Sequence, residues 1–453
     1  MNQTTIGKYR WTICSLLFFA TTVNYLDRQV LSLLAPDLSK EFGWTNGDYA
    51  NITAIFQFVY AISMLFAGRI IDKLGTKSGY TWAIIIWSIG AIVHAYSIFI
   101  GSVVVNIMAL VGLAAVPVSI IGFMISRALL AVGEAGNFPS ALRATAEYFP
   151  KKERSFATGI FNSGTNVGAI LAPLTVPWVA KQWGWETAFI LIGALGFIWL
   201  IFWRIYYEKP ENQKRLSKNE LEYINSDAGE DVIISSEEVK VPWIKLLGYK
   251  QTWAFAFGKF MTDGVWWFFL FWLPKYLEAQ YGMVKTEIML PLAVLYSMTM
   301  FGSIGGGWFP IYFIKKGFSP YDGRMKAMLL IAFFPLVVLA AQPLGGYTFW
   351  IPVILIGIGA SAHQAWSANI FTTVSDMFPK KAVGSIVGIG GMAGGFGGVV
   401  MSKLGGAFFD HYKALGHIQT GYTIMFAICA VSYLIAWCVM KLLVPVYKPI
   451  QDL

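Results

Sequence analysis

Two pairs of charged residues lie inside apolar stretches that are long enough to cross a membrane. Asp27 and Arg28 lie in the first stretch, and Arg127 and Glu134 lie in a later one. A charged side chain at the centre of a bilayer costs at least about 2.5–3.5 kcal/mol on insertion scales, so such residues are rare and usually functional. Two cations combined with two titratable acids predict a binding site for an anion whose passage is linked to protons.

The depth of each charge predicts its partner. If the two stretches cross the membrane in opposite directions, Asp27 and Arg127 each lie about 12 Å from the same outer end, at 1.5 Å per residue. We therefore expect these two side chains to pair. Glu134 follows Arg127 by two helical turns on the same face, about 10 Å farther from that outer end.

Arg28 is then left free to bind a ligand. Tyr25 precedes it by one helical turn and can share its face. A planar guanidinium binds a carboxylate through two parallel hydrogen bonds, so Arg28 and Tyr25 are the expected site of a substrate carboxylate. The alternative is that all four charges neutralise one another as ties between helices. Buried ion pairs are poor stabilisers compared with apolar packing, which disfavours that alternative.

The composition indicates a membrane protein. The chain has 453 residues, of which 56% are hydrophobic and only 13% are charged. A soluble domain usually carries about 25% charged residues. Apolar segments of about 20 residues recur along the chain, and each can span roughly 30 Å of hydrocarbon as a helix. The three cysteines have neither disulfide nor metal-binding spacing, so we expect no metal site.

These segments predict an all-α integral membrane protein with twelve transmembrane helices. Most Lys and Arg residues fall in the loops of one side, which indicates that both termini lie in the cytoplasm and that the chain is a multi-pass protein of a bacterial inner membrane. The net charge of +9 follows from this bias and requires no nucleic acid. The expected spans are 11–34, 49–71, 80–100, 119–141, 155–179, 186–206, 253–276, 289–313, 327–342, 348–373, 384–407 and 421–443.

An internal repeat predicts two halves. The segment Glu-Tyr-Phe-Pro-Lys-Lys at 147–152 recurs as Asp-Met-Phe-Pro-Lys-Lys at 376–381, and both copies fall in loops of the same side. Two six-helix halves of parallel topology, with a site between them near the membrane midplane, are a known transporter layout. We expect an N-terminal half at 1–207, a cytoplasmic linker at 208–251 and a C-terminal half at 252–453.

A loop motif strengthens this interpretation. The stretch from Gly68 to Lys77, which includes Asp72, Lys73 and Gly75, resembles the loop of the major facilitator superfamily between helices two and three. The resemblance implies a charge relay that latches the cytoplasmic side in one state of the transport cycle. The alternative is an ordinary basic loop with a glycine turn.

Within that superfamily, the chain resembles the anion:cation symporter family. The motif Tyr25-x-Asp27-Arg28 and the pair Arg127-x6-Glu134 match that family's pattern. The resemblance implies that Arg28 binds an organic anion, that Asp27 and Glu134 carry protons, and that Arg127 answers to Asp27. It implies proton-coupled import by alternating access, with protons as the coupling ion and no other cofactor. It also assigns a substrate contact to Tyr60.

The C-terminal half narrows the expected substrate. Amide groups can bond sugar hydroxyls and an indole can cover a sugar ring, although packing is an equal alternative for Trp366. Lys259 and Asp263, one turn apart, form either a substrate contact or a pair that satisfies itself. The stretches 259–276 and 363–395 resemble those of hexuronate transporters, which favours glucuronate and galacturonate over aldonates and glucarate. The expected sugar-facing residues are Trp266, His363, Gln364, Trp366 and Asn369.

Other functions are less compatible with the sequence. There is no GxxxxGK[ST] loop, so ATP is not the expected energy source, and no constellation of reactive side chains indicates an enzyme. A non-transporting sensor of a sugar acid would not need two intramembrane acids. Organophosphate exchange would favour facing arginines, whereas the second half offers only Lys259. We expect a monomer in the lipid bilayer whose partners are an organic anion and protons.

Overall fold

The computed structural model describes residues 7–112, 116–227, 242–446, 448 and 450. Regular structure within these residues is helical throughout, without strands. Helices satisfy their backbone hydrogen bonds internally, as a bilayer requires. The first half contains α1 (Tyr9–Phe42), α2 (Asn46–Leu74), α3 (Thr76–Val93), α4 (Ser97–Leu110), α5 (Val118–Glu134), α6 (Asn137–Tyr148), α7 (Lys151–Trp183) and α8 (Trp185–Tyr206).

Two short helices precede the second half. They are α9 (Lys218–Ile224) and α11 (Trp243–Leu247). The second half contains α12 (Lys250–Tyr281), α13 (Met289–Lys315), α14 (Pro320–Phe333), α15 (Ala341–Leu344), α16 (Trp350–Met377), α17 (Lys380–Ala414) and α18 (Ile418–Leu443).

Nine helical stretches of the described chain are long and apolar enough to cross a membrane. Helices α1, α7 and α12 are 34, 33 and 32 residues long but are richer in polar residues. The predicted all-helical membrane architecture is thus confirmed. The full count of twelve spans stays a prediction, because it requires these three helices to cross as well.

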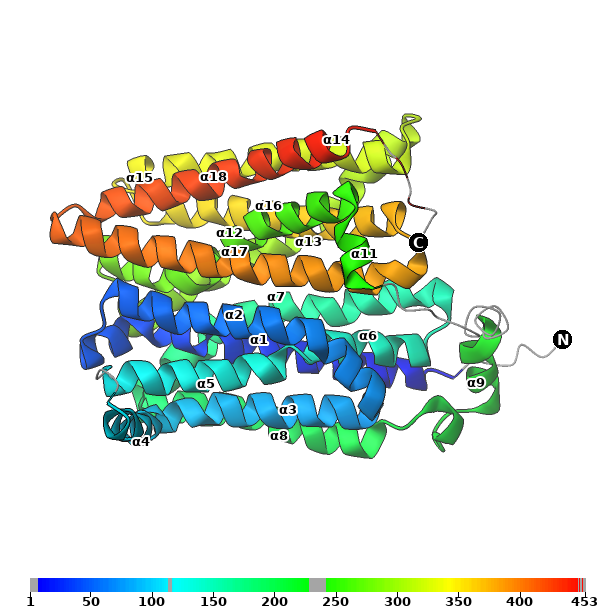
Figure 1. The fold of residues 1–453 in the computed structure, drawn as a ribbon, viewed down its shortest axis with the longest axis horizontal. Coiled ribbons are helices and arrows are strands. Elements are labelled where there is room, and N and C mark those ends of the chain that lie inside the picture. Colours follow the sequence, from blue (N-terminus) through cyan, green and yellow to red (C-terminus); the bar gives the residue numbers. More distant parts are fainter. Residues whose placement is uncertain (1–6, 113–115, 228–241, 447, 449, 451–453) are drawn as a thin grey trace.

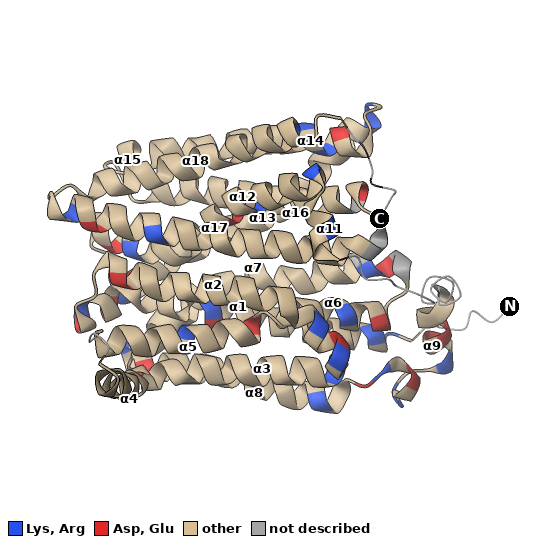
Figure 2. Cartoon of the chain, in the orientation of Figure 1, with Lys and Arg blue, Asp and Glu red and all other residues tan. Residues whose placement is uncertain are grey.

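The two sets of helices lie side by side (Figure 1). Helices α1 to α8 form one bundle and helices α12 to α18 form the other, with α2 against α17 and α7 against α13 where they meet. The first residues of α1 and the last residues of α18 lie at the same end of the bundle, which we call the terminal end. Charged residues gather at the two ends of the helices, and only a few lie along the middle (Figure 2).

The apolar stretch between the third and fourth expected spans forms an additional helix. Figure 1 shows α4 nearly end-on, crosswise to the long helices and at the end opposite the termini. It packs closely on α5, because a Cβ on Gly101 would lie 2.0 Å from the carbonyl oxygen of Val118 and one on Gly122 would lie 1.8 Å from that of Ser97. The apolar residues between the expected spans 80–100 and 119–141 therefore form a separate helix, and residues 113–115 after it lie outside the described residues.

Polar contacts join the two halves at the end opposite the termini. The backbone N–H and side-chain amide of Asn46 donate to Oδ1 of Asp410 at 2.9 and 3.0 Å, and the N–H of Gly47 donates to Oδ2 at 2.6 Å. The Tyr49 hydroxyl donates to the carbonyl of Phe271 at 2.6 Å. Asp410 thus caps the start of α2 from the other half, where the helix dipole favours an anion. These contacts hold the halves together at this end.

Candidate functional site

Arg28 forms a buried ion pair with Glu134. Its Nε and Nη2 both lie 2.7 Å from Oε2 of Glu134, and the two side chains are 4% and 0% exposed. The prediction that Arg28 is free of an ion pair is therefore wrong, because its guanidinium is bound to Glu134. The reason is the tilt of helical side chains toward the start of their own helix. The long Arg28 side chain extends toward the terminal end, where Glu134 lies.

Aromatic rings from both halves surround the Arg28 guanidinium. Its Cζ lies 4.8 Å from the ring centre of Tyr25 and 4.9 Å from that of Tyr60. Phe56 lies at 5.6 Å, and Trp267, on α12 of the second half, lies at 5.1 Å. Ring faces attract cations at these distances. Arg28 therefore lies between the two halves, as a site for alternating access requires, and Tyr25 and Tyr60 are beside it as expected.

Arg127 and Asp27 do not pair, so that prediction is also wrong. Arg127 Nη1 and Nη2 donate to the backbone carbonyl of Arg28 at 3.2 and 3.3 Å. Both carboxylate oxygens of Asp27 are buried and receive no hydrogen bond within the described part of the chain. Equal depth in the membrane did not suffice to predict the pairing, because two side chains at the same depth can point in different directions. The four charged residues of this site thus form one buried ion pair, Arg28–Glu134, and leave one buried carboxyl, that of Asp27, without a donor among the described residues.

Buried amide groups without a partner lie on the same two helices, α1 and α2, as Arg28 and Tyr60. Both side-chain polar atoms of Gln29 and the Nδ2 of Asn24 are buried without a partner in the described structure. The Oε1 of Gln57 accepts from Ser402 at 3.0 Å across the two halves, whereas its Nε2 is left unbonded. Buried polar groups in native proteins usually have partners. These amides are therefore candidates for binding ligand hydroxyls, and sequence reasoning missed Gln29 and Gln57 because glutamine alone carries no motif.

Trp267, and not the predicted Trp266, is the tryptophan beside Arg28. Adjacent residues point about 100° apart on a helix, so Trp266 and Trp267 cannot face the same site. Trp266 instead stacks on the His363 ring, with 5.2 Å between ring centres. His363 is hydrogen-bonded through Nδ1 to the Tyr433 hydroxyl at 2.9 Å. Trp266 and His363 therefore contribute to packing inside the second half.

The remaining residues expected on the tenth span also contact their own half. Asn369 donates through Nδ2 to the carbonyls of Gly306 and Ala365, both at 2.8 Å. Trp366 is fully buried and packs against Tyr433 at 5.5 Å, in keeping with the packing alternative. Gln364 is only partly buried, and it remains the sugar-facing candidate on α16.

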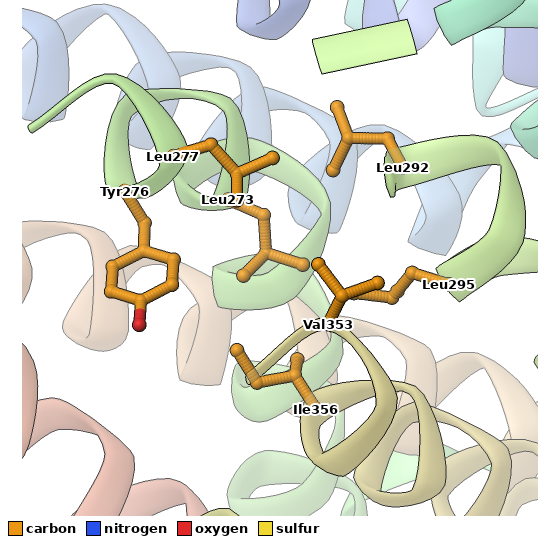
Figure 3. A pocket seen from close by; sticks show the side chains of 7 residues that line it. All are labelled: Leu273, Tyr276, Leu277, Leu292, Leu295, Val353 and Ile356. Carbon is orange, nitrogen blue, oxygen red and sulfur yellow. The ribbon is translucent and has the colours of Figure 1, made fainter. Parts of the chain in front are cut away.

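A small apolar cavity in the second half is not a substrate site. The space that the centre of a water molecule can reach inside it is about 10 Å³, so the cavity has room for roughly one water. Figure 3 shows leucine, valine and isoleucine side chains of α12, α13 and α16 around it, with the Tyr276 hydroxyl directed away. That hydroxyl bonds to Gln342 at 3.1 Å. A wall without polar groups cannot orient a sugar acid.

The end of α2 is held to α6 by polar contacts within the first half. Asp72 Oδ1 accepts from Arg143 at 2.9 Å, and Arg143 also donates to the Ile71 carbonyl at 3.2 Å. Gly75 ends α2 with φ +79°, a conformation that favours glycine. Lys73 is exposed and Gly68 is partly buried. The latch role of this loop stays a prediction.

Comparison with known proteins decides the family. The model of the Major Facilitator Superfamily matches residues 17–402. The chain belongs to this superfamily. It is 30% identical over 439 residues to the hexuronate transporter of Escherichia coli K12, covering 95% of this chain and 94% of that one. It is 29% identical to the galacturonate transporter of Dickeya chrysanthemi, covering 78% and 95%. The D-galactonate transporter of Escherichia coli O6:H1 is 26% identical, covering 91% and 92%.

Solved structures support the same fold. A D-xylose–proton symporter has a TM-score of 0.71 at 14% identity and covers 96% of this chain and 97% of that one. A bacterial homologue of the human lysosomal transporter Spinster, in an inward-facing and occupied conformation, has a TM-score of 0.69 at 19% identity, covering 98% of each chain. This major facilitator protein is therefore a membrane-spanning transporter related to carriers of sugar acids, and its family is not enzymatic.

Proposed function

We propose that the protein is a proton-coupled symporter that imports a sugar-acid anion, most favourably a hexuronate such as glucuronate or galacturonate. The observation that supports this most is the position of Arg28, which lies between aromatic rings of both halves while its fork is held by the buried acid Glu134. Relatives named for hexuronate, galacturonate and galactonate transport support the substrate class. Aldonates and glucarate are the alternative substrates.

Competition for Arg28 can couple the substrate to a proton. Glu134 and a substrate carboxylate are the same chemical group and compete for one guanidinium fork. A proton on Glu134 weakens its ion pair with Arg28 and leaves the fork to the substrate. Proton binding and anion binding then favour each other, which is the thermodynamic condition for coupled symport.

Asp27 is the second proton-carrying group in this mechanism. An ionised carboxylate is costly to bury without a donor, and Asp27 has none among the described residues. Arg127 donates to the backbone carbonyl of Arg28 and so ties α5 to α1, the helix that carries Asp27 and Arg28. A hexuronate carries one negative charge, so one proton makes the step electroneutral. A second proton would add roughly 2.3 kcal/mol per 100 mV of membrane potential.

The sugar ring is bound by rings and amides. Tyr60 and Trp267 offer aromatic faces beside Arg28, and the unbonded amide nitrogen of Gln57 offers a hydrogen bond to a hydroxyl. Rocking of the two halves would open the site to each side in turn. The basic loops at the terminal end favour a cytoplasmic position for both termini, in a bacterial inner membrane. We propose that the protein acts as a monomer in the lipid bilayer, and that its partners are an organic anion and protons.

Substrate competition in reconstituted vesicles tests the proposed class. Labelled glucuronate uptake is measured with unlabelled galacturonate, galactonate or glucarate present in excess. We expect galacturonate to inhibit most strongly. Stronger inhibition by galactonate or glucarate would keep a sugar-acid transporter but reject hexuronate as its preferred substrate.

A further inference from the structure

Another ion pair, largely buried, lies on α12 in the other half. Lys259 Nζ is 2.6 Å from Oδ2 of Asp263, and the two side chains are 6% and 17% exposed. Lys259 also lies 4.3 Å from the ring centre of Phe371. A buried ion pair is weak support for stability, because similar apolar side chains often stabilise as well or better. Its position therefore has to be considered for a role in ligand binding.

Helix geometry places this pair on the face of α12 that meets Arg28. Lys259, Asp263 and Trp267 follow one another at intervals of four residues, so they form a row along one face. Trp267 is 5.1 Å from the Arg28 guanidinium. Asp263 is thus one helical turn from the ring that contacts the proposed carboxylate-binding arginine.

Two further observations agree with this placement. On the α17 side, a Cβ on Gly394 would lie 2.2 Å from Asp263 Oδ2, and one on Gly398 would lie 2.7 Å from Trp267 Cδ1. The glycine face of α17 therefore leaves room for the same row of side chains. Asp263 is thus a carboxylate of the second half in the same row as Trp267, the ring that contacts Arg28.

We propose that Asp263 is a specificity-determining residue that selects sugar acids with one carboxylate over those with two. This inference rests on the proposed function and extends it to the far end of the substrate. With one carboxylate on Arg28, the far end of a hexuronate presents hydroxyl groups, which donate hydrogen bonds to a carboxylate. The far end of an aldarate presents a second carboxylate, which Asp263 repels. A site that opposes the wrong ligand in this way gains discrimination without tighter binding of the right one.

Lys259 determines what happens when Asp263 is changed. In the wild-type protein its ammonium is neutralised by Asp263 at 2.6 Å. Asp263→Asn removes the repulsion and leaves a buried cation without its anion. That cation can attract the second carboxylate of an aldarate, so this single change both removes a barrier and adds an attraction.

Competition binding on the purified, full-length protein tests the proposal. The ratio of the inhibition constants of glucarate and glucuronate is measured for the wild type, Asp263→Asn, Asp263→Glu and the double variant Lys259→Met/Asp263→Asn. Asp263→Asn is expected to lower the ratio at least tenfold toward glucarate, and Asp263→Glu is expected to restore it. Glu211→Gln, an exposed site on the linker, is the matched control for loss of an acid.

The double variant separates charge selection from loss of fold. It lacks both charges, so its ratio should fall below that of the wild type but less than in Asp263→Asn, because no free ammonium attracts the second carboxylate. An unchanged ratio in either variant overturns the proposal, as does a wild type that prefers glucarate. Wild-type protein that binds neither sugar acid contradicts the proposed function itself and the inference with it.

Discussion

Replacing Arg28 by lysine keeps the charge and removes the fork. Two Arg28 nitrogens lie 2.7 Å from one Glu134 oxygen, which shows that the guanidinium presents adjacent donors in the space where a substrate carboxylate would bind. A lysine ammonium is a point charge and cannot reproduce a bidentate arrangement. Losing one charge-assisted hydrogen bond costs about 1.5–3 kcal/mol. That cost corresponds to a Kd for glucuronate that is about 10- to 150-fold weaker.

Calorimetric titration of detergent-solubilised protein with glucuronate measures this loss. Arg204→Lys is the matched control, because Arg204 is exposed at the end of α8. Its affinity should equal that of the wild type. The melting temperature of Arg28→Lys shows whether the variant is still folded. An affinity within about threefold of the wild type in a folded Arg28→Lys protein would place the carboxylate elsewhere and refute this role of the guanidinium.

The other predictions concern proton coupling, closure and pH. Asp27→Asn should abolish proton-driven accumulation but retain some substrate exchange, measured in vesicles; full pH-dependent accumulation would remove Asp27 from the mechanism. Glu134→Gln should bind glucuronate with an affinity that no longer improves as the pH falls, because the competing anion is gone; a preserved pH dependence in titrations would contradict this. Asp410→Asn should shift spin-label distances across the far end toward the open form, since three hydrogen bonds to α2 are weakened; unchanged distances would show that this cap does not control closure. The hydrogen bond from Lys77 holds the pKa of Glu208 below its ordinary value of 4.5, so the pair stabilises the fold above that value and the effect is lost as the pH falls through the lowered pKa. Lys77→Met should therefore lower stability by at most about 1 kcal/mol at pH 7 and by less under acid conditions, as measured by melting; equal losses at both pH values would contradict this sign.

The sequence was sufficient for the architecture and for the identity of the central residues. Apolar length predicted the all-helical membrane fold, and the cost of burying charge singled out Arg28 and Glu134 before any contact was known. The partners could not be predicted in the same way. Depth along a helix fixes Cα positions, whereas a long arginine reaches more than one turn in the direction of its tilt. This is why Arg28 pairs with Glu134 and Asp27 is left without a donor.

The sequence also does not show how each helix is rotated about its own axis. Trp266 and Trp267 are neighbours in sequence, yet one packs on His363 and the other meets Arg28 from across the two halves. Aromatic residues cover both sides of α12, so the sequence alone does not show which of these two tryptophans is turned toward the site. The row Lys259, Asp263, Trp267 becomes informative only when one member is placed by a contact.

Accumulation of glucuronate against its own concentration gradient is the most direct test of proton-coupled symport. The wild-type protein is reconstituted into vesicles, an inward proton gradient is imposed, and labelled glucuronate is followed inside and outside. If the protein is a proton-coupled symporter, the glucuronate concentration inside the vesicles rises above that outside, and a protonophore abolishes this accumulation. Glucuronate that only equilibrates, with or without the proton gradient, would contradict proton-coupled symport.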